Sequence, residues 1–170
     1  MRRLLGGDDI IKHRARQLSI NLLHCWVDTF ELECLLTKIR ESSTEQSVQL
    51  CEKAAGLYKG AFLPTDTGLN WAVSSRETLK NRLIRAIITA GRYYEQKGEW
   101  ERAADYYTKG IETDSLTEEF YRRLMDCYLN LGNKANAVKT YKSCYSKLEA
   151  ELGVEPSHET MAVYSSILQI

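Results

Sequence analysis

Two stretches of this sequence decide its fold: GEWERAADYY at residues 98–107 and GNKANAVKTY at residues 132–141. Each begins with a glycine and carries an alanine five residues later and a tyrosine nine residues later. The two stretches start 34 residues apart, and another tyrosine lies four residues before each glycine. The recurring pairs are Tyr94 and Tyr128, Gly98 and Gly132, Ala103 and Ala137, and Tyr107 and Tyr141. Self-similarity at a fixed period of this length is typical of stacked repeat units.

A period of 34 residues is that of tetratricopeptide repeats, in which each unit is a helix, a turn and a second helix. The glycine would end the first helix, and the small alanine would let the second helix pack closely against it. The match is incomplete: the second small position is Gly110 in one copy and Cys144 in the other, and Ser115 and Glu149 replace the usual closing proline. We therefore predict an all-α fold, a right-handed superhelix of about seven helices built from helix hairpins.

Helical periodicity begins at Asp28, and no strand pattern follows residue 27. Ser42-x-x-Glu45 matches a capping box that would open a second helix, which we expect Gly60 to end. Residues 61–70 form the one clear loop. Start signals at Ser115-x-x-Glu118 and Pro156-Ser157, and stops at glycines, define the later helices. These are predicted over residues 71–97, 100–113, 117–131, 134–152 and 157–169.

The first 24 residues follow a different pattern. Two short apolar stretches, Ile10-Ile11 and Leu18-Ser19-Ile20, flank a basic connection at residues 12–17. This arrangement predicts a small β-hairpin, which would be marginally stable on its own in water.

Composition limits the class of protein. The 170 residues are 44% hydrophobic and 27% charged, with 23 basic and 23 acidic side chains. A chain of this length can bury a core as one domain, and its apolar content is too high for intrinsic disorder. It has no apolar run of about eighteen residues to span a membrane and no signal peptide, so we expect a cytoplasmic protein.

Residue patterns typical of enzymes are absent from the sequence. There is no phosphate-binding glycine loop, no G-x-S-x-G and no H-E-x-x-H, and the three histidines are isolated. Five scattered cysteines form no C-x-x-C pair, so we interpret most of them as buried structural thiols. We therefore expect no catalytic residues, no metal site and no cofactor.

Charge is balanced overall but uneven along the chain. Residues 71–98 carry six basic and two acidic side chains. One interpretation is a solvated face of a long helix; the other is a surface that meets a partner. Ten tyrosines allow the same two interpretations, packing or groove lining. The candidate interaction surface consists of Arg76, Lys80, Arg85, Arg92, Tyr106 and Tyr121.

Several segments together carry a family resemblance. The most specific are LYKGAFLP at residues 57–64 and LEAELGVEPSHET at residues 148–160. In order along the chain they accompany CWVD (25–28), Trp71 with Arg76-Glu77, GEWERA (98–103) and EFYRRLM (119–125). This series resembles the bacterial transcriptional activator domain, the tetratricopeptide-like module of the antibiotic regulatory protein (SARP) family. Independently of the family, we expect Trp26 and Phe30 to anchor the start of the first helix.

The resemblance implies an organisation and a function. Residues 25–170 would be the activator domain, and residues 1–24 the remnant of a winged helix-turn-helix, with 1–6 ending its recognition helix and 10–20 forming its wing. The parent protein would bind DNA through the rest of the winged helix. The partner of the helical module would be RNA polymerase, a second copy of the chain or another domain of the same regulator, with no membrane involved.

Two other functions remain open from the sequence. One is a peptide-binding scaffold of tetratricopeptide type that is not linked to transcription. The other is a small-molecule sensor with a pocket between helices. No set of residues in the sequence nominates a ligand.

Overall fold

The computed structural model describes residues 10–14, 17–21, 23–24, 26–42, 44–60 and 70–169. Three sequence expectations fall outside these residues: the helix end at residues 1–6, Cys25, and the loop at 61–69.

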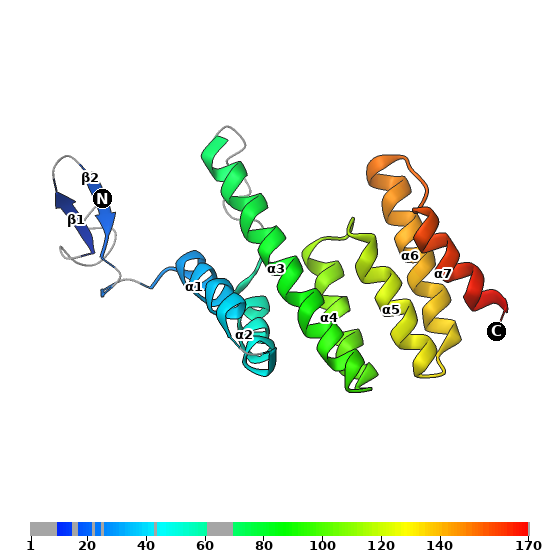
Figure 1. Ribbon diagram of the computed structural model, residues 1–170. Coiled ribbons are helices and arrows are strands. Elements are labelled where there is room, and N and C mark those ends of the chain that lie inside the picture. Colours follow the sequence, from blue (N-terminus) through cyan, green and yellow to red (C-terminus); the bar gives the residue numbers. More distant parts are fainter. Residues whose placement is uncertain are drawn as a thin grey trace.

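Within the described residues, a two-stranded hairpin is followed by seven helices (Figure 1). All the predicted helices are present, with bounds that agree within about one turn. The all-α prediction is therefore confirmed, as is the short N-terminal hairpin. The elements are β1 (Ile11–Arg14), β2 (Gln17–Ile20), α1 (Asp28–Glu41), α2 (Thr44–Leu57), α3 (Asn70–Gln96), α4 (Trp100–Thr113), α5 (Glu118–Asn130), α6 (Lys134–Leu152) and α7 (His158–Gln169).

The helices stack side by side in chain order (Figure 1). The pairs α1–α2, α3–α4 and α5–α6 follow one another, and α7 packs against both α5 and α6 at the C-terminal end. The hairpin lies beyond α1 at the opposite end (Figure 1). Its strands are antiparallel, with Ile11 opposite Ile20 and Arg14 opposite Gln17.

The two repeat units turn in the same way. Gly98 and Gly132 have φ angles of 72° and 69°, in the left-handed region that favours glycine. The N–H of the residue after each glycine donates to the carbonyl oxygen of Tyr94 in the first unit, at 2.9 Å, and of Tyr128 in the second, at 2.7 Å. This bonding closes each helix end in a Schellman motif. The recurrence of glycine and tyrosine in the sequence is thus explained by a recurring helix end.

Small residues allow close packing between the repeat helices. Ala103 and Ala137 are fully buried. A Cβ atom added to Gly110 would lie only 2.4 Å from the ring of Phe120, so α4 and α5 touch directly at this point. Gly91 on α3 has the same relation to the ring of Tyr107, also at 2.4 Å.

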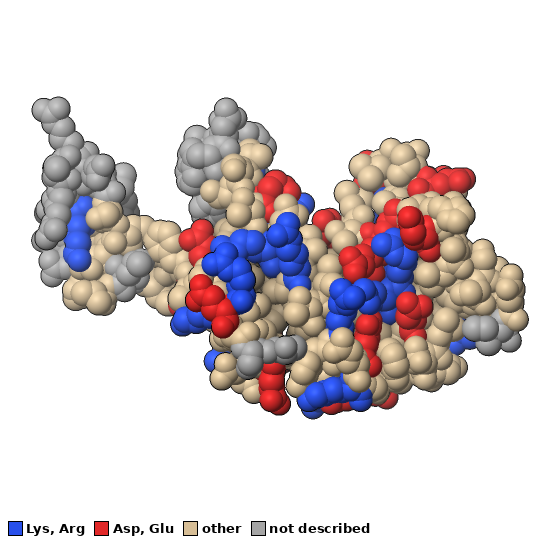
Figure 2. Space-filling model, viewed as in Figure 1, with Lys and Arg blue, Asp and Glu red and all other residues tan. Residues whose placement is uncertain are grey.

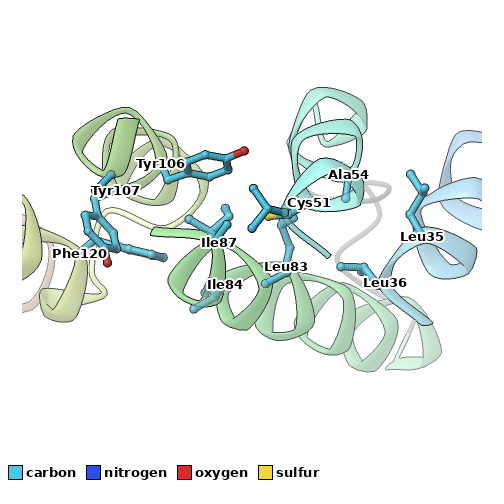
Figure 3. Packing of buried hydrophobic residues seen from close by; sticks show 14 of the residues in the cluster. Leu35, Leu36, Cys51, Ala54, Leu83, Ile84, Ile87, Tyr106, Tyr107 and Phe120 are labelled. Carbon is cyan, nitrogen blue, oxygen red and sulfur yellow. The ribbon is translucent and has the colours of Figure 1, made fainter. Parts of the chain in front are cut away.

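One hydrophobic core runs from α1 to α5, with α3 at its centre (Figure 3). Leu83 and Ile87 of α3 are fully buried within it. Residues from two helices cover each side of α3. These are Leu35 and Leu36 of α1 and Cys51 and Ala54 of α2 on one side, and Tyr106 and Tyr107 of α4 with Phe120 of α5 on the other (Figure 3).

Two local expectations about α1 and α2 were wrong. Trp26 is 67% exposed and Phe30 is 44% exposed, so neither side chain is buried as an anchor at the start of α1. Ser42 does not open α2: it ends α1, and its hydroxyl donates to the carbonyl oxygen of Lys38 at 2.7 Å.

The start of α5 also differs from the expectation. Asp114, rather than Ser115, organises it, because its carboxylate accepts from the N–H of Leu116 at 3.2 Å and from the hydroxyl of Thr117 at 3.0 Å.

Candidate interaction surface

The four basic residues of the predicted surface all lie on α3, but they do not form one cluster. At 3.6 residues per turn, Arg76 and Lys80 lie on one side of the helix, whereas Arg85 and Arg92 lie on the opposite side. Arg85 and Arg92 are exposed, whereas Arg76 and Lys80 are half-buried. The four basic residues therefore lie on two opposite sides of α3 and do not form a single surface.

Lys80 is held within the protein. Its ammonium lies 3.3 Å from the carboxylate of Glu77 on the same helix and 3.9 Å from that of Asp114 beyond α4. Because these carboxylates already satisfy its charge, Lys80 ties α3 to the turn before α5.

The two tyrosines of the predicted surface are core residues, which corrects the prediction. Tyr106 is 7% exposed and Tyr121 is 1% exposed. The Tyr121 hydroxyl donates to the carbonyl oxygen of Ser115 at 3.0 Å, and burial raises its pKa to about 12. Both rings fill space between helices, the packing interpretation that the sequence had left open.

Arg85 instead shares a groove with Arg40 and Arg82, neither of which belonged to the candidate surface. We name this the α1–α3 groove; it encloses about 620 Å³ between the end of α1, the first turns of α2 and the middle of α3. Figure 2 shows basic side chains gathered over α1 and α3. The residues that line the α1–α3 groove include Leu36, Ile39, Arg40, Arg82, Arg85 and Ala86.

A signal for part of this groove was present in the sequence. Arg82 and Arg85 are three residues apart, so they share a face of α3. Arg40, however, comes from α1, and only the packing of α1 against α3 brings it near the other two.

The arginines near α5 are already engaged within the protein (Figure 2). Arg123 contacts Glu95 on α3 at 3.1 Å and Glu119 on its own helix at 2.9 Å. The carboxylate of Glu95 also accepts from the Tyr107 hydroxyl at 2.7 Å. This network joins α3, α4 and α5, and its role is structural.

The segment Glu155-Pro156-Ser157 fastens α7 to α5. The N–H and hydroxyl of Ser157 both donate to one carboxylate oxygen of Glu118, at 2.9 and 2.7 Å. Arg122 donates to the hydroxyl of the fully buried Thr160 at 2.9 Å. Burial of the Glu118 carboxyl raises its pKa, but the hydrogen bonds from Thr160 and Ser157 and the charge of Arg122 lower it by more, so the net shift is downward. These residues of the LEAELGVEPSHET segment therefore serve the fold.

Three cysteines behave as buried packing residues, as predicted. Cys51, Cys127 and Cys144 are buried, and burial raises the pKa of each thiol to about 12. Thiols with such pKa values stay protonated near neutral pH and are poor nucleophiles and metal ligands. Cys34 is exposed.

The described residues offer neither a metal-binding cluster nor a membrane-spanning helix. No group of three or more His, Cys, Asp or Glu side chains among them is arranged to hold a metal ion. No helix in the described part of the chain is long and apolar enough to cross a membrane.

Comparison with protein families agrees with this architecture. The family model described as "Bacterial transcriptional activator domain" matches residues 27–168, which span the helical array from α1 into α7. The chain belongs to the bacterial transcriptional activator domain family. A comparison with curated proteins gave no match. The family consists of regulatory domains of transcription activators and is not an enzyme family, in accord with the absence of catalytic motifs from the sequence.

Proposed function

We propose that this chain is the protein-contact module of a bacterial transcription activator of SARP type. Its helical array would make the activating contact with RNA polymerase, and it would also contact a second copy or another domain of the same regulator. The observation that carries the proposal is the family match over the whole helical array. The stand-alone peptide scaffold is not favoured, because the matched family is one of transcription activators.

Two features of the structure support a role in contact rather than catalysis. Stacked helix pairs present an extended surface, which repeat proteins use to bind other proteins. The sequence segments that carry the family resemblance also explain the fold: Gly98 ends a helix, and Ser157 fastens α7 to α5. Contacts with partners would therefore depend on exposed residues outside those segments.

A reporter assay in bacterial cells tests this function. The full chain is fused to an unrelated DNA-binding domain whose operator lies upstream of a weak promoter. We expect more transcript than with the DNA-binding domain alone, because tethering places the module beside RNA polymerase. An equal amount of transcript from both proteins, at equal expression, would refute the activating role.

We propose further that residues 1–24 belong to a winged helix-turn-helix and that the β1–β2 hairpin is its wing. The antiparallel pairing of Ile11 with Ile20 supports this assignment. The reading frame upstream of Met1 provides the test. Codons for a helix-turn-helix that continue into Met1 would support the proposal, and a stop codon directly upstream in the same frame would overturn it.

A further inference from the structure

The α1–α3 groove combines an apolar floor with basic walls. Leu36 and Ala86 are buried at its base, and Ile39 is half-buried beside them. Arg40 stands on the α1 side, and Arg82 and Arg85 stand on the α3 side. The lining contains no acidic side chain among the described residues.

Arg82 and Arg85 of α3 differ from the arginines of α4 and α5, whose charges are neutralised by nearby glutamates. Arg102, Arg122 and Arg123 each lie within 4.0 Å of a glutamate. Neither Arg82 nor Arg85 forms an ion pair with any residue in the described part of the chain.

The remaining arginine of the groove has only a weak partner. Arg40 pairs with its neighbour Glu41 at 3.6 Å, and both side chains are well exposed, so water screens the attraction. The groove therefore retains a net positive charge that can attract a negatively charged ligand.

Hydrogen bonds fix one arginine of the groove and the end of α1 beside it. Arg82, which comes from α3, donates to the hydroxyl oxygen of Thr37 on α1 at 3.0 Å, and this bond fixes the position of its guanidinium. The hydroxyl of Ser47 donates to the carbonyl oxygen of Ile39 at 2.8 Å, and that of Ser42 donates to the carbonyl oxygen of Lys38 at 2.7 Å. These hydrogen bonds satisfy two of the carbonyl oxygens at the C-terminal end of α1.

The combination favours a peptide over DNA. Arginine binds carboxylates with paired N–H donors, and an apolar floor in a concave site holds apolar side chains. Duplex DNA needs an extended basic face that follows its phosphates, and the chain has no net charge. We propose that the α1–α3 groove binds an acidic segment of a partner protein, in which Asp or Glu side chains alternate with apolar ones. The proposal rests on the protein-contact function above and specifies its surface and the chemistry of its partner.

Fluorescence anisotropy of labelled peptides tests the groove. The probes are short synthetic peptides in which Asp or Glu alternates with Leu or Phe, titrated with the full chain. We expect saturable binding that weakens as salt is added, because Arg40 and Arg85 are exposed to solvent. Absence of saturable binding at low salt would overturn the proposal.

Charge-reversal variants of Arg85 and Arg40 test whether the peptide binds in the α1–α3 groove. Arg85→Glu is expected to weaken binding by about tenfold or more, because it replaces an attraction with a repulsion. Arg40→Glu, from the other wall, is a second variant that should act in the same direction. Arg102→Glu is the matched control, since Arg102 is an exposed arginine of α4 paired with Glu99 at 3.0 Å, and we expect a change of less than about twofold. Equal losses in Arg85→Glu and Arg102→Glu would overturn the proposal.

Binding of duplex DNA of random sequence is measured in the same way, to test whether the groove binds nucleic acid instead of a peptide. Tighter binding of the duplex than of any peptide, together with its loss in Arg85→Glu, would make the groove a nucleic-acid site and refute the peptide assignment. Weak duplex binding that is unaffected by Arg85→Glu supports the peptide.

The reporter assay separates this proposal from the function on which it rests. If the tethered chain activates transcription but binds no acidic peptide, the groove proposal fails and the protein-contact function stands. If the chain binds the peptides through Arg85 but does not activate when tethered, the groove proposal stands and the activating function fails.

Discussion

Close contact between α4 and α5 at Gly110 makes a specific prediction about stability. A Cβ at this position would lie 2.4 Å from both Cδ1 and Cε1 of the Phe120 ring. The ring is fully buried, so it has little room to move. We therefore expect Gly110→Ala to destabilise the protein even though alanine favours helix.

The size of the effect follows from two opposing contributions. Alanine in place of glycine within a helix stabilises by about 0.5–1 kcal/mol. Forcing an extra carbon into a packed core costs about 1–3 kcal/mol. Because carbon atoms normally approach only to about 3.5 Å, the ring of Phe120 must move by about 1 Å, which places the cost near the upper end of that range. The net loss is then about 1.5–2.5 kcal/mol, or roughly 3–10 °C in Tm for a chain of this length.

Gly56→Ala provides the matched control. Gly56 lies in α2, is exposed, and would have no atom within 4 Å of an added Cβ. The same substitution should therefore stabilise the protein slightly, by up to about 1 kcal/mol. Urea unfolding followed by circular dichroism measures both variants. A Gly110→Ala variant as stable as the wild type would show that α4 and α5 do not approach as closely as described.

Three further predictions concern a helix end, a buried carboxylate and an exposed arginine. Gly132→Val should cost about 1–2 kcal/mol, since a β-branched residue is strained at a φ of 69°; an unchanged urea midpoint would place the helix end elsewhere. The pKa of Glu118 is lowered in the folded protein, so its contribution to stability is complete above the ordinary glutamate pKa and is lost as pH falls through the folded value. Stability of Glu118→Gln should accordingly fall less between neutral pH and about pH 3 than that of the wild type, and parallel urea midpoints in the two proteins would contradict this. Arg85→Ala should change the free energy of unfolding by less than about 0.5 kcal/mol because the side chain is exposed and unpaired among the described residues; a larger loss in thermal unfolding would indicate a structural role.

Local signals predicted most of the fold. Glycine is favoured where a helix end needs a positive φ, as at Gly98 and Gly132, and a period of 34 residues places these two ends in successive units. The predicted hairpin also depends only on neighbouring residues. Trp26 was misplaced because helical periodicity places a residue on a helix but does not show how far neighbouring elements bury its side chain.

The candidate surface was only partly predictable. Arg82 and Arg85 share a helix face, which the sequence shows. Arg40 joins them through the packing of α1 on α3, a relation that local periodicity does not contain. Tyr106 and Tyr121 were misjudged for the same reason, since whether a tyrosine is buried depends on which helices pack over it.

Transcription in vitro with purified RNA polymerase most directly tests whether the helical array is an activating module. The template carries the operator of the unrelated DNA-binding domain upstream of a weak promoter, and the full chain is supplied as a fusion to that domain. If the helical array contacts RNA polymerase directly, the fusion should give more full-length transcript than the DNA-binding domain alone, in the absence of any other protein. The same transcript yield from both proteins, at equal operator occupancy, would contradict it.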